Sequence, residues 1–90
     1  MDVLKTDYIS GVNVTLFDVR LSESEVIVFS DCLNYVLMNC SDEQINRFTE
    51  CSSKEELSYF LSDLLELINS IKHNEYIPDR YKNKNEKVQK

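Results

Sequence analysis

The 90-residue chain has 16 acidic and 10 basic side chains, which give it a formal net charge of −6. This sign argues against direct binding to a nucleic-acid backbone or to an anionic membrane surface, because Lys and Arg supply the affinity for phosphate groups. The composition of 42% hydrophobic and 29% charged residues is that of a globular protein, and one Gly and one Pro are too few for an all-β fold.

The first twenty residues predict a β-hairpin over residues 3–20. Apolar residues alternate with polar ones and then change phase, since the set Val12, Val14, Leu16 is followed by the set Phe17, Val19, Leu21. This change indicates a bulge or bend near Phe17. Residues 3–9 are expected to form the partner strand through a turn at Ser10-Gly11. A lone hairpin is marginal in water, so we expect a helix to pack on one of its faces.

A first helix is predicted over residues 23–39. Ser22 and Glu25 have the spacing of a capping box, in which the two side chains satisfy backbone N–H groups of the first turn. The β-branched residues within 25–29 leave a strand as the alternative. The capping box and the apolar period that continues to Cys40 favour the helix.

This helix has two apolar faces. At about 100° per residue, one arc collects Val26, Phe29, Leu33, Val36, Leu37 and Cys40, and the opposite side collects Ile27, Asp31, Asn34, Tyr35 and Met38. Either the helix is sandwiched between the hairpin and the third helix, or the second face is exposed in the isolated chain and becomes buried when a partner or a second copy binds. The second copy would use Ile27, Tyr35 and Met38 as a self-complementary patch.

Two further helices are predicted over residues 42–49 and 54–72. Ser41 opens the shorter one, with Ile45 and Phe48 facing inward, and either Ser52 or Ser53 caps the longer one. The longer helix has an apolar stripe made of Leu57, Phe60, Leu61, Leu64, Ile68 and Ile71. We therefore predict an α+β fold, mainly helical, with the hairpin packed on a three-helix unit over residues 1–78. Residues 79–90 have almost no apolar side chains and are predicted to be a flexible basic tail.

Charge is distributed unevenly along the chain. Residues 21–66 contain ten acids and two bases, a net charge of −8, whereas residues 71–90 contain six bases and three acids, a net charge of +3. On the third helix, the outer side gathers carboxylates around a tyrosine. The candidate partner-binding residues are Glu55, Tyr59, Ser62, Asp63 and Glu66, with Asp42 and Glu43 of the short helix and Tyr35 of the first helix. Such a face is usually only solvated; its sharper interpretation is a docking surface for a basic protein.

The sequence indicates neither a catalytic site nor a metal site. The odd set of Cys32, Cys40 and Cys51 predicts reduced thiols that serve as small buried hydrophobes, and the single histidine, His73, is far from all three in sequence. The only glycine is Gly11, so there is no phosphate-binding loop. We expect no enzyme activity, metal or cofactor. No export signal or membrane-spanning run is apparent, which predicts a cytoplasmic protein.

The stretch LSESEVIVFSDCLNYVLMNCSDEQINRFTECSSKEELSYFLSDLLELI, residues 21–68, reads as a capped helix, a short acidic helix and a Ser-capped helix. In this order of segments it resembles small bacterial toxin-immunity proteins, including those of contact-dependent growth inhibition systems. The resemblance covers about half of the chain and carries over no binding residue. It implies an inhibitor of a partner protein without chemistry of its own, and the acidic charge suits a basic nuclease toxin as the target.

Overall fold

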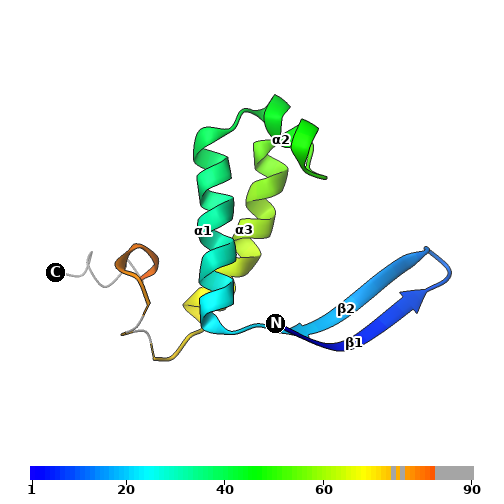
Figure 1. Ribbon diagram of the computed structural model, residues 1–90, viewed down its shortest axis with the longest axis horizontal. Helices are drawn as coiled ribbons and strands as arrows, with labels where there is room; N and C mark the ends of the chain where they lie inside the picture. The colour runs from blue at the N-terminus through cyan, green and yellow to red at the C-terminus, as the bar shows by residue number, and fades with distance from the viewer. Residues whose placement is uncertain (74, 76, 83–90) are drawn as a thin grey trace.

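The computed structural model describes residues 1–73, 75 and 77–82. The chain forms two strands, β1 (Asp2–Ile9) and β2 (Val14–Arg20), then the helices α1 (Glu23–Asn39), α2 (Asp42–Phe48) and α3 (Lys54–Asn69), and later a 3-10 helix, η2 (Asp79–Tyr81). α1 and α3 run antiparallel, with α2 at one end of the pair and the hairpin at the other (Figure 1). The predicted α+β class, with an N-terminal hairpin and three helices, is confirmed.

The hairpin is antiparallel, with Ile9 opposite Val14 at the tip and Asp2 opposite Arg20 at the base. Its register shifts at Leu4, because Val3 pairs with Val19 while Lys5 pairs with Asp18. The irregularity predicted near Phe17 of β2 is therefore found on β1.

Residues 10–13 connect the two strands, so the turn is longer than the Ser10-Gly11 pair predicted from the sequence. Asn13 has a positive φ of 55°, whereas the φ of Gly11 is not positive. Asn is one of the few residues that adopt this left-handed conformation readily. The Tyr8 hydroxyl donates to Asn13 Oδ1 over 2.6 Å, which fixes the end of the loop.

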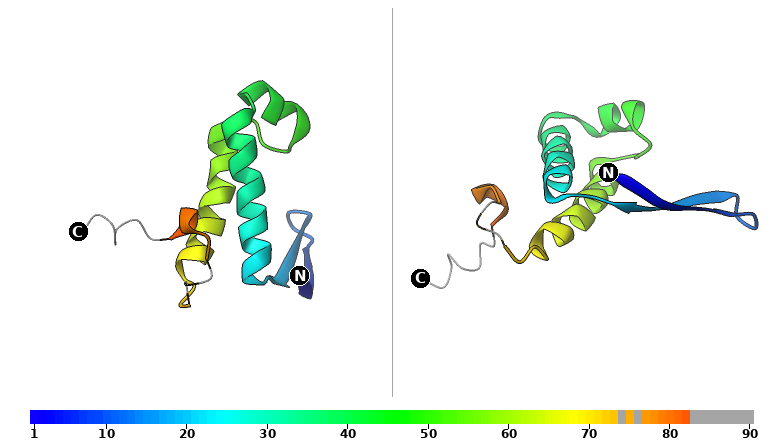
Figure 2. Two further views of the ribbon diagram at one scale, coloured as in Figure 1. Left: turned by 60° about the vertical axis from the view of Figure 1, so that its left-hand side comes forward. Right: turned by 60° about the horizontal axis from the view of Figure 1, so that its bottom comes forward.

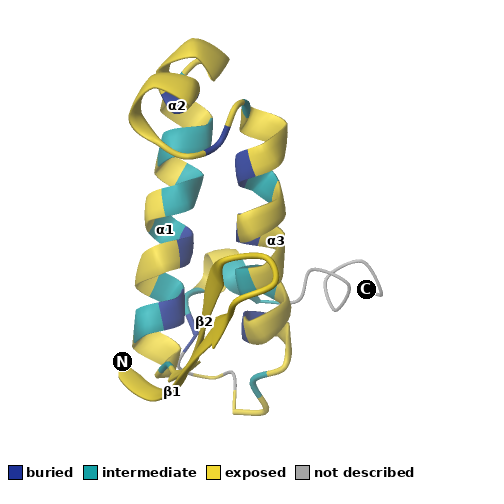
Figure 3. Ribbon diagram, turned by 90° about the vertical axis from the view of Figure 1, so that its right-hand side faces the viewer, coloured by how far each residue is buried: buried dark blue, intermediate teal, exposed yellow. Residues whose placement is uncertain are grey.

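The hairpin does not pack on the helices as the sequence led us to expect. The hairpin projects from the base of the helix pair (Figure 2), and every residue of β1 and β2 is exposed (Figure 3). Only its base meets the body, through the half-buried Leu21 and an ion pair between the Met1 amine and Glu25.

Hydrogen bonds of the first turn set the start of α1. Glu25 N donates to Ser22 Oγ over 3.2 Å, and Ser22 N donates to Glu25 Oε1 over 2.9 Å, so the predicted capping box is present. Residues 25–29 are helical, which excludes the strand alternative, and α1 has the bounds that the sequence predicted.

The other two helices are capped in similar ways. Ser41 and Gln44 form a second capping box at α2, and Ser53, rather than Ser52, accepts from the N–H of Glu56 at α3. Both helices end earlier than predicted, at Phe48 and Asn69 instead of 49 and 72. Phe48 was expected to face inward but is exposed, and Ile45 alone anchors α2.

The core consists of two clusters at opposite ends of the α1–α3 pair. At the α2 end, Ile45, Cys51 and Leu57 are buried, with half-buried residues of α1 around them. At the hairpin end, the buried residues are Val26, Ile68 and Ile77. Ser30 and Leu61, near the middle of each helix, are also buried, and the Ser30 hydroxyl donates to the Val26 carbonyl over 2.8 Å.

A segment after α3 returns to α1, and we call Ile77, Arg80 and Tyr81 the C-terminal clasp. Arg80 makes a two-pronged contact with Asp31, with distances of 3.0 Å from Nε to Oδ1 and 2.6 Å from Nη2 to Oδ2. The Tyr81 hydroxyl donates to the same Asp31 Oδ1 over 2.6 Å. The tail predicted to begin at residue 79 therefore makes specific contacts up to Tyr81, and residues 83–90 lie outside the described part.

The clasp explains the second apolar face of α1. It covers the half of this face that contains Ile27, Asp31 and Asn34, a role that the sequence analysis gave to the hairpin. Tyr35 and Met38 remain exposed, Met38 by 81%. The patch of Ile27, Tyr35 and Met38 considered for self-association is thus divided, because Ile27 packs against the core.

Candidate functional site: an acidic helix face beside an apolar groove

The sequence-predicted acidic residues of α3 share one solvent-facing side of that helix, opposite the buried Leu57, Leu61 and Ile68. We call this side the acidic face; all of its members are exposed, and they are Glu55, Tyr59, Ser62, Asp63 and Glu66. The 3.6-residue period brings them together, since positions three or four apart are neighbours on a helix surface.

Tyr59 lies among these carboxylates with 61% of its surface exposed. Its hydroxyl donates to Glu55 Oε2, one turn earlier, over 3.3 Å. Within the described part of the chain, no cation lies within ion-pair distance of Glu55, Asp63 or Glu66. The face therefore presents uncompensated negative charge beside an accessible aromatic ring.

The acidic residues of α2 are partly occupied by local contacts. Asp42 Oδ1 accepts from the backbone N–H of Lys54 over 2.7 Å, which places Asp42 at the start of α3 and gives it a capping role. Glu43 pairs with Arg47 on its own helix over 3.6 Å. Asp42 therefore adjoins the Glu55 end of the acidic face, and Glu43 brings little free charge to it.

Tyr35, the remaining predicted site residue, lies on α1. It is exposed, and it is about half a helical turn away from the buried side of α1 that faces α3. The structure therefore does not bring Tyr35 together with the acidic face.

An apolar groove, which no pattern in the sequence predicted, borders the acidic face. It lies between α1 and α3, has a volume of about 590 Å³, and is lined by Phe29, Cys32, Leu33, Cys51, Leu57, Phe60, Asp63 and Leu64. Phe60 was assigned to the core stripe of α3 but is 57% exposed at the groove edge. Cys32 was expected to be buried but is exposed, while Cys51 is buried as predicted.

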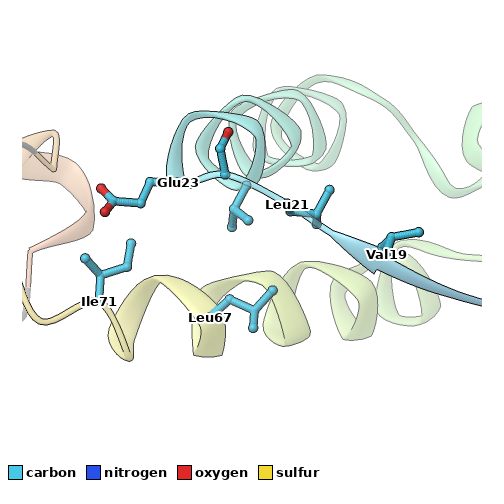
Figure 4. Close-up of a pocket in the computed structure, with 7 residues that line it drawn as sticks. Val19, Leu21, Glu23, Leu67 and Ile71 are labelled. Carbon is cyan, nitrogen blue, oxygen red and sulfur yellow. The ribbon is translucent and has the colours of Figure 1, made fainter. Parts of the chain in front are cut away.

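A smaller hollow of about 270 Å³ lies at the hairpin base. Val19 and Leu21 approach it from the hairpin side, and it is also lined by Leu67 of α3 and by Ile71, which follows the end of that helix (Figure 4). The α1–α3 pair therefore has apolar hollows both at its middle and at its junction with the hairpin.

The clear pKa shifts belong to structural contacts away from the acidic face. The amine of Met1 holds the pKa of Glu25 below its ordinary value, mainly by hydrogen bonding. Arg80 does the same for the pKa of Asp31, and burial, followed by the bond to Asp31, raises the pKa of Tyr81. His73 is exposed. Across residues 1–73, 75 and 77–82, no three side chains of His, Cys, Asp or Glu converge as a metal site.

No helix in the described ranges is both long and apolar enough to cross a bilayer. Comparison of the chain with protein-family models, curated proteins and solved structures found no match. The case for a function therefore rests on the geometry and charge of the site.

Proposed function

We propose that this protein is a non-catalytic, cytoplasmic inhibitor that binds a basic protein through the acidic face of α3. In its most specific form the proposal is an immunity protein that neutralises a nuclease-type toxin. The observation that carries it is the set of uncompensated carboxylates Glu55, Asp63 and Glu66 around the exposed ring of Tyr59.

Electrostatics supports a basic partner. The carboxylates are concentrated on a body with a charge of −8 over residues 21–66. Such a field speeds association with a positively charged surface and repels acidic competitors. A nuclease site is basic because it binds phosphates, so a row of carboxylates at helical spacing is suited to occupy it.

Tyr59 provides the apolar part of the contact. A tyrosine offers a large, rigid contact area at a low cost in conformational entropy, and such residues dominate binding energy at protein interfaces. Its hydrogen bond to Glu55 limits the ring to one orientation before binding. The exposed Phe60 next to it extends the apolar contact area.

The proposal is tested by reversing the charge of the acidic face and comparing which proteins each tagged chain captures from a lysate of the host. A tagged chain carrying Glu55→Lys, Asp63→Lys and Glu66→Lys is compared with the wild-type chain. The matched control carries Asp2→Lys, Asp7→Lys and Asp18→Lys, which change the net charge equally at exposed positions of the hairpin, away from α3. We expect the wild type and the control to retain a basic protein that the acidic-face variant loses.

The retained protein must also behave as a toxin target. Expressed alone it should arrest growth, and co-expression of the wild-type chain, but not of the acidic-face variant, should restore growth. The affinity of the wild-type complex should fall steeply with salt. Equal retention by all three chains, or capture of acidic proteins only, would exclude the acidic face as the binding surface.

A further inference from the structure

The hairpin has one face without any charged residue. Paired residues of an antiparallel hairpin lie on the same face, and neighbours along a strand alternate between faces. The register therefore puts Val3, Thr6, Tyr8, Thr15, Phe17 and Val19 on one side, which we call the uncharged face. The acids and bases of the two strands, Asp2, Lys5, Asp7, Asp18 and Arg20, lie on the opposite side.

Most of this uncharged face is bare, and Val19 at its base lines the hollow between the hairpin and the helices. Tyr8 is 62% exposed and Phe17 60% exposed, and Val3 and Val19 are exposed as well. An isolated two-stranded hairpin is only marginally stable in water, because neither face is shielded from solvent. The hairpin is therefore expected to gain stability from a surface that covers these side chains.

The α1–α3 groove has the complementary property. It is an apolar depression edged by Phe29 and Phe60. The groove follows α3 from Leu57 to Leu64, a rise of about 10 Å along the helix. About three residues of an extended strand have this length. The groove can therefore hold the part of the uncharged face that contains Tyr8 and Phe17.

The hairpin is not placed to fill the groove of its own chain. Only Leu21 and Ser22 separate β2 from α1, and both are held. Leu21 packs against the Val26 cluster, and Ser22 is fixed by the capping box with Glu25. Folding back over the same helices would break this junction, whereas contact with another molecule leaves it intact.

We propose that two copies of this chain associate by reciprocal exchange, with the uncharged face of each hairpin lying in the α1–α3 groove of the other copy. A twofold arrangement makes each copy both donor and acceptor, so the contact is formed twice.

Area supports this arrangement. The exposed rings of Tyr8 and Phe17 offer roughly 200–250 Å², judged from the area that aromatic side chains bury. Because each copy is both donor and acceptor, the contact is formed twice and each copy contributes roughly 400–500 Å², an interface of the smaller, weaker class. One contact alone would be half as large.

Charge supports a second copy as well. The hairpin residues 1–20 have three acids and two bases, so the hairpin itself is almost neutral. Its uncharged face brings no carboxylate against Asp63 at the groove edge. Because two acidic bodies approach through apolar surfaces, the dimer should tighten as salt rises. A complex with a basic partner should weaken under the same change.

Cysteine cross-linking tests the proposal directly, since the native Cys32 is exposed in the groove. A chain with Phe17→Cys and Cys32→Ser is mixed with wild-type chain and oxidised mildly with copper phenanthroline. We expect a disulfide between position 17 of one chain and Cys32 of the other, identified by peptide mass. Thr15→Cys, on the same face, repeats the test with the aromatic ring retained. Leu16→Cys, on the opposite face, is the matched control and should cross-link at least about tenfold less.

Other cross-links would overturn the proposal. A disulfide between two copies of position 17 would show hairpins pairing with each other. A link within one chain carrying both Phe17→Cys and the native Cys32 would show the hairpin closing on its own body. Absence of the 17–32 and 15–32 links, in variants with wild-type circular dichroism, would exclude the exchange.

Light scattering on the wild-type chain gives an independent measure. The expected mass is that of a dimer, and Phe17→Lys should raise the dissociation constant at least about tenfold, while Leu16→Lys leaves it within about twofold. A monomer at every concentration and salt would refute the exchange. None of these results depends on the basic partner, so the two proposals fail separately.

Discussion

Substitution of Ile77 by Ala measures how much the C-terminal clasp contributes to the fold. Ile77 is 5% exposed and packs with Val26 and Ile68, so the substitution removes buried methyl groups and leaves a cavity. Core substitutions of Ile by Ala cost about 2–5 kcal/mol. Since Ile77 lies at the edge of its cluster, where neighbours can relax, the lower part of this range, about 2–3 kcal/mol, is expected.

The clasp offers a matched comparison in Arg80→Gln. Arg80 makes two hydrogen bonds to Asp31, but the side chains of this pair are 58% and 38% exposed, and exposed pairs contribute little because water screens them. Unfolding in urea is followed by circular dichroism at a fixed protein concentration. The free energy of unfolding falls by about 1 kcal/mol per M urea for a domain of this size, so Ile77→Ala should lower the unfolding midpoint by about 2–3 M. Arg80→Gln should lower it by less than half as much. If Arg80→Gln costs as much as Ile77→Ala, polar contacts rather than burial secure the clasp.

Two further predictions concern single contacts. The pKa of Asp31 is lowered from its ordinary value of 3.8, chiefly by the hydrogen bond from Arg80. The contribution of the Asp31 carboxylate to stability is therefore complete above pH 3.8 and is lost as the pH falls through the lower pKa of the folded state. In urea titrations, the free energies of unfolding of wild type and Asp31→Asn should differ near neutral pH and converge in acid. A difference that stays constant with pH would contradict this. At the hairpin tip, the left-handed conformation of Asn13 costs an ordinary residue about 1–2 kcal/mol. Asn13→Val should accelerate amide exchange in β1 and β2 about fivefold or more. Asn13→Gly loses the hydrogen bond from Tyr8 but keeps the backbone conformation, so it should accelerate exchange clearly less. Equal exchange in both variants would contradict the assignment.

Local signals in the sequence predicted most of the elements. The start of α1 was predicted correctly, because Ser22 and Glu25 make their hydrogen bonds within one turn and need no distant partner. The early end of α3 is also local in origin, since the Ile71 N–H donates to the carbonyl of Ile68, three residues back, and the four-residue pattern of the helix stops there. No residue type at this point signals the end strongly. The acidic face followed from helical spacing alone.

Contacts between distant residues were not predictable in the same way. Asp31 meets Arg80 across 49 positions, and nothing in either neighbourhood marks the pair. Arg80 and Tyr81 lie in a polar segment that reads as a tail. Likewise, the apolar stripe of α3 places Phe60 on the helix side that faces α1, but only the packed pair shows that no side chain covers it. For this reason the groove was missed and the hairpin was expected to lie over the helices.

The division of the core into two clusters has a consequence for how the molecule opens. Ile45 and Ile77 secure opposite ends of the α1–α3 pair, and among the described residues only Ser30 and Leu61 are buried between them. Each end can therefore fray while the other stays closed, as separate units of local unfolding. The Glu55 end of the acidic face belongs to the first unit and the hairpin junction to the second. A ligand that rigidifies one end need not slow the local unfolding of the other end.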